Sequence, residues 1–219
     1  MIKLVIFDVD GVLLDSETLY IDSTLEFCKK NGYPIPREVL MKTIGSGREN
    51  HRRVFKGFMG EDFDYETYIK KEEECFENYK RLNPPKIKKG AFELLDYLKK
   101  HGISTALATS TDKDRQLHNF EASGLDHPFD FMVFGDDITR HKPDPEIYEI
   151  VLDHFGYPKD EVLIIEDSIN GINSGLNAGV KVIFIPDEVE VPEELVAKTY
   201  RKLDDLSQVI EVIEELGKV

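Results

Sequence analysis

The sequence predicts an α/β fold in which helices cover both faces of a parallel sheet and a small helical domain is inserted near the N-terminus. Two observations predict this fold. Short apolar runs rich in β-forming residues alternate with amphipathic segments of helical length, which is typical of a parallel sheet with crossover helices. From Asp15 to about Pro85 this alternation stops, and the interval contains only helical periodicities.

Four or five short apolar runs are predicted to be the strands of the sheet. They are LVIF at 4–7, ISTALA at 103–108, FMVF at 131–134, VLII at 162–165 and VKVIFI at 180–185. Each is bounded by turn residues and is largely apolar, as expected for strands buried on both faces.

Amphipathic segments connect these strands. AFELLDYLKKHG, residues 91–102, carries its apolar residues on one face and ends at Gly102, and DRQLHNFEASG ends in the same way at Gly124. Both are predicted to be crossover helices. The tail segment SQVIEVIEELG, residues 207–217, has the same one-sided pattern and is predicted to close the sheet.

The interval without β-rich runs predicts a separate helical domain. LYIDSTLEFCKKNG and YETYIKKEEECFENYKRL are its helical segments, and Asn83-Pro84-Pro85 marks its end. An ordinary crossover needs a single helix, so an insertion of this length indicates a cap. We therefore expect a core domain of residues 1–14 and 86–219 and a cap domain of residues 15–85. Ligands of open α/β sheets bind at the carboxyl ends of the strands, where a cap can close a site.

Charge and composition exclude several partners. The chain has 219 residues and a formal net charge of -15, which repels nucleic acid and anionic membrane surfaces. No apolar run approaches the roughly 20 residues that a membrane helix needs, and the first run turns acidic too soon for a signal peptide. We expect a cytoplasmic monomer that binds a small molecule and keeps Cys28 and Cys75 as free thiols.

Acidic side chains directly follow two of the predicted strands. Asp8 and Asp10 follow the first strand, and Glu166 and Asp167 follow VLII. Because the carboxyl ends of parallel strands share one edge of the sheet, these four carboxylates are expected to converge. Clustered carboxylates repel one another unless a cation lies between them, and all-oxygen ligation without His or Cys selects magnesium. The sequence therefore predicts a Mg²⁺ site.

Hydroxyl and ammonium groups are predicted at the same edge. Thr109 and Ser110 follow ISTALA, and Lys142 lies in the HKPDP loop after FMVFGDD. Such groups hold phosphate oxygens and neutralise their charge, so that a carboxylate can approach phosphorus. Of Asp8 and Asp10, one can be a nucleophile and the other a general acid and base. Together these residues predict phosphoryl transfer.

These segments resemble the four motifs of the haloacid dehalogenase superfamily, in the branch with a helical cap between motifs one and two. The matching segments are FDVDGVLLDSE, ALATST, HKPDP and IIEDSINGINSGLNAGV. The resemblance implies a Rossmann-like, doubly wound core, an aspartyl-phosphate intermediate and a magnesium cofactor. It also implies roles for the acidic residues. Asp8 matches the nucleophile, Asp10 the general acid and base with its backbone carbonyl on the metal, Asp167 a magnesium ligand, and Glu166 a direct or water-mediated one.

The same resemblance implies roles for the phosphate-binding residues. Thr109 matches the motif-two hydroxyl, Ser110 a neighbouring phosphate contact and Lys142 the charge-neutralising lysine. The branch most similar to this chain is that of the β-phosphoglucomutase-like phosphatases. In it the segment IGSGREN matches a cap loop whose arginine, here Arg48, meets a distal phosphate or another polar group of the substrate.

Two positions depart from the mutase pattern. Tyr20 stands where the sugar-phosphate mutase has a hinge histidine, and His141 replaces the glycine before the motif-three lysine. The first departure disfavours a mutase, because restraint of the general acid depends on that region. The second has no interpretation from the sequence.

Three functions remain open. The first is a magnesium-dependent phosphatase acting on small phosphorylated metabolites such as sugar phosphates, and the second is a phosphosugar mutase on the same scaffold. The third is a non-hydrolytic phosphoacceptor similar to a receiver domain, which also uses acidic residues, magnesium and a lysine. Receivers lack the long helical insertion and a second aspartate placed as general acid. Halide displacement is disfavoured, since a leaving halide needs no proton and Asp10 would have no role.

Overall fold

The computed structural model describes residues 1–44, 47–126 and 129–217. The chain divides into two compact units: a core unit, formed by Met1–Asp15 and Lys86–Val219, and a helical unit, formed by Ser16–Pro85. These bounds differ by one residue from the expected division at 14 and 15. The role of the helical unit as a cap stays a prediction. Within the described ranges, no helix combines the length and the apolar character that a membrane crossing requires.

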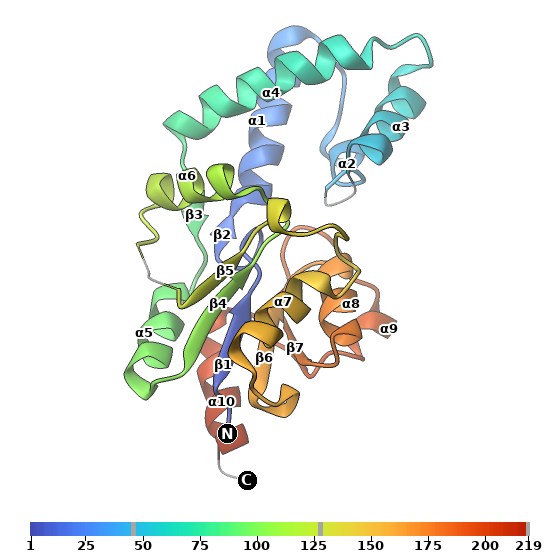
Figure 1. The fold of residues 1–219 in the computed structure, drawn as a ribbon. Helices are drawn as coiled ribbons and strands as arrows, with labels where there is room; N and C mark the ends of the chain where they lie inside the picture. The colour runs from blue at the N-terminus through green and yellow to red at the C-terminus, as the bar shows by residue number, and fades with distance from the viewer. Residues whose placement is uncertain (45–46, 127–128, 218–219) are drawn as a thin grey trace. The chain divides into compact units, whose positions relative to one another are not determined.

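A six-stranded sheet forms the centre of the core unit (Figure 1). Its order is β5-β4-β1-β6-β7-β8, and every neighbouring pair is parallel. The strands are β1 (Leu4–Phe7), β4 (Ser104–Ala108), β5 (Phe131–Val133), β6 (Val162–Glu166), β7 (Lys181–Phe184) and β8 (Arg201–Lys202). The predicted α/β class is therefore confirmed.

Helices cover both faces of this sheet. They are α5 (Ala91–His101), α6 (Lys113–Ser123), α7 (Glu146–Phe155), α8 (Ile169–Asn177), α9 (Glu193–Val196) and α10 (Val209–Gly217). Alternate residues of β1 point to opposite faces, as the pleat requires. Val5 and Phe7 pack in one cluster with α5 and α10, whereas Leu4 and Ile6 pack in the other with α7 and α8.

The helical unit has a core of its own. Its helices are α1 (Ser16–Asn31), α2 (Arg37–Leu40), α3 (Gly47–Met59) and α4 (Tyr65–Leu82). Phe27 and Cys28 of α1 pack with Phe55 of α3 and with Tyr65 and Tyr68 of α4. The two chain segments that flank the unit pair as a short antiparallel ladder, β2 (Leu14–Asp15) with β3 (Lys86–Ile87).

The sixth strand was not expected from the sequence. β8 consists of two residues, Arg201 and Lys202, which pair with Ile183 and Phe184 of β7. Two charged residues carry no β-forming pattern, so only the neighbouring edge of the sheet defines this strand.

Candidate active site

The candidate site lies where the central strands of the core unit end. β1 pairs with β4 on one side and with β6 on the other, and Phe7 is aligned with Leu107 and with Ile165. Asp8 follows β1, Thr109 follows β4, and Glu166 is the last residue of β6. The parallel register therefore brings segments as far apart in the chain as residues 8 and 166 to one edge of the sheet.

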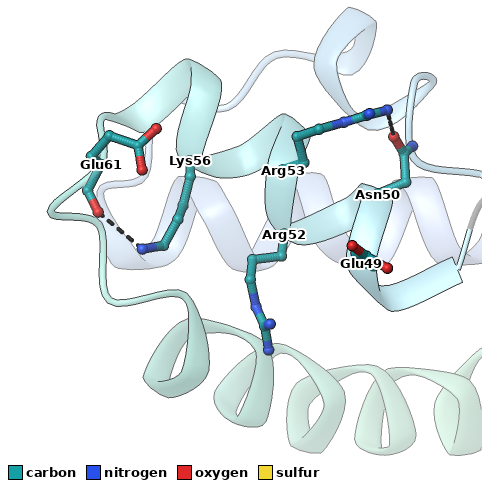
Figure 2. Close-up of a pocket in the computed structure, with 6 residues that line it drawn as sticks. All are labelled: Glu49, Asn50, Arg52, Arg53, Lys56 and Glu61. Carbon is teal, nitrogen blue, oxygen red and sulfur yellow. Dashed lines mark hydrogen bonds between the residues drawn. The ribbon is translucent and has the colours of Figure 1, made fainter.

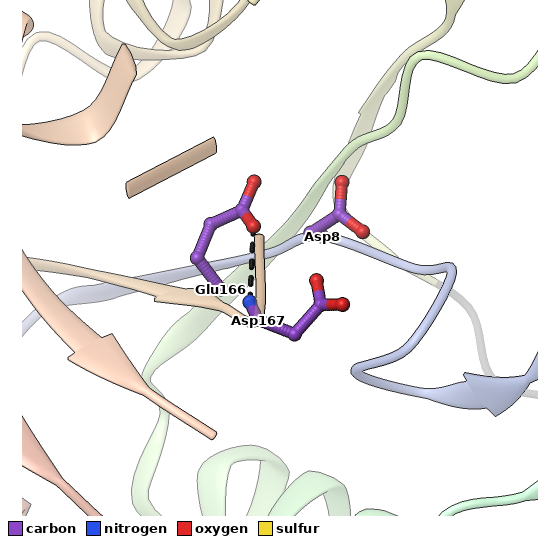
Figure 3. Close-up of side chains that lie close together, drawn as sticks. All are labelled: Asp8, Glu166 and Asp167. Carbon is purple, nitrogen blue, oxygen red and sulfur yellow. Dashed lines mark hydrogen bonds between the residues drawn. The ribbon is translucent and has the colours of Figure 1, made fainter. Parts of the chain in front are cut away.

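Three carboxylates meet at this edge (Figure 3). Asp8, Glu166 and Asp167 are buried, and each offers an oxygen within 4.8 Å of the oxygens of the other two. Of the four carboxylates expected to converge, these three meet. Asp10 directs its carboxylate elsewhere, toward the loop after β4.

Lys142 lies between two of these carboxylates. Its Nζ donates to Asp8 Oδ1 at 2.6 Å, to Glu166 Oε1 at 2.7 Å and to the carbonyl oxygen of Ala108 at 3.0 Å. The side chain is 6% exposed. Burial lowers the pKa of Lys142, but Asp8 and Glu166 more than reverse this and hold the pKa well above its usual value. The ammonium group is therefore a permanent positive charge in the site.

Glu166 has both carboxylate oxygens engaged. Oε1 accepts hydrogen bonds from Lys142 and from the Tyr148 hydroxyl at 2.8 Å. Oε2 accepts from the backbone N–H of Asp167 at 3.0 Å, and from both the N–H and the hydroxyl of Ser168. Five donors leave little capacity for a direct bond to a cation. Glu166 is thus better suited to orienting Lys142 and the start of α8, and its predicted role as a metal ligand stays a prediction.

Asp10 is held by two hydroxyl groups. Thr111 Oγ1 donates to Asp10 Oδ2 at 2.7 Å, and Thr109 Oγ1 lies 3.5 Å from the same oxygen. Thr109 Oγ1 in turn accepts a hydrogen bond from the backbone N–H of Thr111 at 3.1 Å. Thr109 is buried, whereas Ser110 between them is exposed. The predicted contacts of Thr109 and Ser110 with phosphate stay predictions.

Glycine is required at two positions of the site. A methyl group on Gly171 of α8 would lie 1.7 Å from Glu166 Oε1. Gly11 has φ +86°, and a methyl group there would lie 2.2 Å from Asp167 Oδ2. At both positions the absent side chain lets a carboxylate approach the backbone.

The site carries an excess of negative charge. Asp8, Asp10, Glu166 and Asp167 are four carboxyl groups, and Lys142 is the single cation among these five residues. Burial raises the pKa of Asp8 to about 7, and the nearby carboxylates of Glu166 and Asp10 add to the shift, which Lys142 opposes. A bound cation would offset this charge. Carboxylate oxygens are the ligands that magnesium prefers, so the donor set fits Mg²⁺.

Two residues missed by the sequence analysis belong to this site. Thr111 contacts Asp10. Its sequence signal is weak, because it is simply the third hydroxyl residue in a row after Thr109 and Ser110. Tyr148 is fully buried, donates to Glu166, and places its ring 4.9 Å from Lys142 Nζ. In the sequence, Tyr148 lies six residues after Lys142 and looks like an ordinary apolar position of a helix, so it was not singled out.

Three other sequence-predicted positions are not among the residues that make these contacts. Arg48 is exposed and forms an ion pair with Glu73 inside the helical unit, and residues 45–46 of its loop lie outside the described residues. Tyr20 also has its contact within that unit, since its hydroxyl lies 3.1 Å from His51 Nε2. His141 is exposed, and nothing in the structure explains why a histidine stands where the mutase pattern has glycine.

The surface of the helical unit carries a hollow of about 680 Å³ (Figure 2). It is lined by Glu49, Asn50, Arg52, Arg53, Lys56 and Glu61. None of the residues predicted to carry chemistry lines it. The hollow and the carboxylate cluster are therefore distinct features of different units.

Comparisons with known proteins agree on one family. A family model described as haloacid dehalogenase-like hydrolase matches residues 5–185. A phosphorylated carbohydrates phosphatase of Thermotoga maritima is 32% identical over 184 residues, which cover 82% of this chain and 83% of that protein.

Two solved structures are similar over nearly the whole chain. One is a Thermotoga maritima protein provisionally described as a β-phosphoglucomutase, with a TM-score of 0.81 and 27% identity over 98% of this chain and 99% of that one. The other is CbbY from Rhodobacter sphaeroides in complex with phosphate, with a TM-score of 0.71 and 26% identity over 95% of this chain and 96% of that one.

Proposed function

The chain belongs to the haloacid dehalogenase-like hydrolase family and is a phosphatase, and from this premise we propose that it hydrolyses small phosphorylated metabolites, sugar phosphates among them, with magnesium and through an aspartyl-phosphate intermediate. One observation carries the proposal. Lys142 joins Asp8 to Glu166 at the carboxyl edge of the sheet, beside Asp167. This arrangement supports a carboxylate nucleophile that is held in place and surrounded by groups able to neutralise phosphate charge.

The first half of the reaction transfers the phosphoryl group to the enzyme. An oxygen of Asp8 attacks phosphorus, a P–O bond to Asp8 forms, and the bond to the leaving oxygen breaks. Asp10, in its protonated form, gives its proton to that leaving oxygen. Lys142 balances the negative charge that accumulates on the phosphoryl oxygens. Magnesium, held by Asp8, Asp167 and the backbone carbonyl of Asp10, would supply further charge neutralisation.

The second half releases phosphate. Asp10, now ionised, takes a proton from a water molecule, and the water oxygen attacks phosphorus. The bond between phosphorus and Asp8 breaks, which regenerates the Asp8 carboxylate and the protonated Asp10. Two carboxylates placed two residues apart thus perform separate tasks.

Names of related proteins support the substrate class. The Thermotoga relative is named for phosphorylated carbohydrates, and the CbbY structure contains phosphate. We expect this chain to accept small phosphate esters, with Arg48 as the proposed contact to a distal polar group of the substrate.

A screen of phosphorylated metabolites tests the proposal. Release of free phosphate is measured with magnesium, after removal of metal by a chelator, and after magnesium is restored. We expect turnover only with metal, and near-complete loss of turnover in Asp8→Asn because an amide is a poor nucleophile. Full activity in excess chelator after verified metal removal would exclude the magnesium mechanism. A single phosphorylation event without turnover would identify a phosphoacceptor instead.

A second assay separates the phosphatase from the mutase. β-Glucose 1-phosphate is supplied with magnesium and a trace of the 1,6-bisphosphate, and glucose 6-phosphate and free phosphate are followed together. Tyr20 replaces the hinge histidine and contacts His51, so we expect the restraint that keeps water from the intermediate to be missing. Free phosphate should therefore predominate. Faster formation of glucose 6-phosphate would make the chain a mutase.

A further inference from the structure

A fifth carboxylate lies close to the site without having been assigned to it. Asp187 follows β7, and its side chain is 7% exposed. Its Oδ1 forms an ion pair with Lys88. Its Oδ2 is buried and has no hydrogen-bond partner within the part of the chain that the structure describes. A buried carboxylate oxygen without a hydrogen-bond donor is unfavourable, so a donor from outside the described protein atoms is expected at this oxygen.

The unsatisfied carboxylate lies beside Asp167. The two residues offer oxygens within 4.8 Å of each other. Gly11 lies next to both, since a methyl group there would be 2.2 Å from Asp167 Oδ2 and 3.1 Å from Asp187 Oδ2. The turn that carries Asp8 and Asp10 therefore approaches both carboxylates through a residue without a side chain.

Charge alone does not account for this arrangement. Lys88 engages one oxygen of Asp187, and the other oxygen is placed near a second carboxylate of the same sign. Such a contact is unfavourable unless a positive or hydrogen-donating group lies between the two oxygens. A magnesium ion in a protein keeps several of its water molecules, and each of these donates hydrogen bonds to nearby acceptors.

We propose that Asp187 accepts a hydrogen bond from a water molecule carried by the magnesium ion that Asp8 and Asp167 hold, and that Lys88 positions its carboxylate for this contact. The inference rests on the proposed function, because it presupposes the magnesium site. It adds Asp187, Lys88 and Gly11 to the groups that set the affinity for the metal. Asp187 is a positioning residue, since it does not touch the reacting phosphoryl group.

Magnesium binding in the absence of substrate tests this role. The full chain, freed of metal, is titrated with MgCl₂ by calorimetry. Loss of an acceptor that supports a metal ligand costs about 10- to 100-fold in metal affinity, so we expect Asp187→Ala to weaken Mg²⁺ binding by at least about tenfold. Asp187→Asn, which keeps an acceptor but loses the charge, should give a smaller loss and carries the test if the alanine variant does not fold.

Two further variants make the result specific. Asp205 pairs with Lys89 at 2.6 Å, next to Lys88 in sequence, so Asp205→Ala removes a comparable ion pair elsewhere on the core unit and should leave the affinity unchanged. Lys88→Gln should weaken Mg²⁺ binding, but less than Asp187→Ala does, because Asp187 keeps its charge and loses only the group that positions it. The alternative is that Asp187 only forms a structural ion pair with Lys88. In that case Asp187→Ala and Lys88→Gln will both lower the melting temperature but leave the Mg²⁺ affinity within twofold of wild type. This result would overturn the proposal.

A final control separates this inference from the magnesium site itself. Asp167→Asn should abolish measurable Mg²⁺ binding. If it does, and Asp187→Ala binds like wild type, only the role of Asp187 is wrong. If Asp167→Asn leaves binding intact, the proposed magnesium site fails and the inference fails with it.

Discussion

Thr111 donates a hydrogen bond of 2.7 Å from its Oγ1 to Oδ2 of Asp10. Asp10 is the proposed general acid and base, and its carboxylate is thereby turned toward the loop after β4, away from the cluster of Asp8, Glu166 and Asp167. The hydrogen bond gives the two neighbouring carboxylates different surroundings. One is paired with Lys142, and the other is held by hydroxyl groups.

Removing the Thr111 hydroxyl should slow only those reactions that need a proton donor. Thr111→Val is expected to reduce turnover of alkyl phosphates about 10- to 100-fold, because Asp10 is no longer held where it protonates a poor leaving group. p-Nitrophenyl phosphate should lose less than about threefold, since its phenolate leaves without a proton. Thr111→Ser, which keeps the hydroxyl, should restore the alkyl rates. Equal losses on both ester types would mean that Thr111 has a purely structural role.

Loss of the buried ammonium group should affect both activity and stability. Lys142→Met is expected to lower kcat about 10²- to 10³-fold, as for removal of one preorganised charged donor. It also leaves Asp8 and Glu166 without their cation, which should cost roughly 3 to 5 kcal/mol of unfolding free energy. The matched control is Lys89→Met, whose side chain is 82% exposed and should change neither quantity. A kcat within tenfold of wild type would contradict the role given to Lys142.

Alanine substitutions at two helical glycines should have opposite effects on stability. A methyl group on Gly171 would collide with the Glu166 carboxylate, so Gly171→Ala should lower the melting temperature and the activity. Apart from its chain neighbours and the adjacent backbone of α3, Gly57 has no atom within 4 Å of an added methyl group, so Gly57→Ala should raise stability by about 0.5 to 1 kcal/mol. Thermal unfolding followed by circular dichroism measures both. A Gly171→Ala variant as stable as wild type would show that the Glu166 carboxylate can adopt another position.

His51 should make the helical unit sensitive to acid. It is buried against Phe55, with ring centroids 4.2 Å apart, and its Nδ1 lies 2.9 Å from the Tyr65 hydroxyl. Burial lowers its pKa to about 4, and the positive charge of Arg48 contributes. An unfolded histidine titrates near 6.5, so between about pH 6.5 and pH 4 the unfolded state binds a proton that the folded state does not. Stability is therefore lost as the pH falls through this window.

Urea unfolding at pH 7 and pH 5 measures the effect. The contribution of His51 to the loss over this interval should be up to about 2 kcal/mol. His51→Gln cannot titrate and should show a smaller loss, whereas His118→Gln, which changes an exposed side chain, should behave like wild type. The same pH dependence in His51→Gln and in wild type would assign the effect to carboxylates instead.

Local sequence patterns were sufficient for the fold class and for the residues at the strand ends. Apolar runs identify buried strands because a strand covered on both faces has no polar side, and residues that follow such runs must lie at the edge of the sheet. Asp8, Glu166 and Asp167 could be placed together for this reason. Lys142 could be assigned from its motif, although nothing local to its loop indicates that it contacts Asp8.

Only the tertiary structure decided which polar side chains form hydrogen bonds and ion pairs with one another. Asp10 contacts Thr111, which lies 101 positions away, and Asp187 pairs with Lys88, which lies 99 positions away. Such pairs leave no periodicity, because a side chain finds its hydrogen-bond partner through the packing of strands and loops rather than through spacing along the chain. The same holds for Glu166. The sequence marks it as an acidic residue at the end of a strand. Its five donors come from α7, from the turn between β6 and α8 and from the HKPDP loop, and their convergence directs its carboxylate to Lys142.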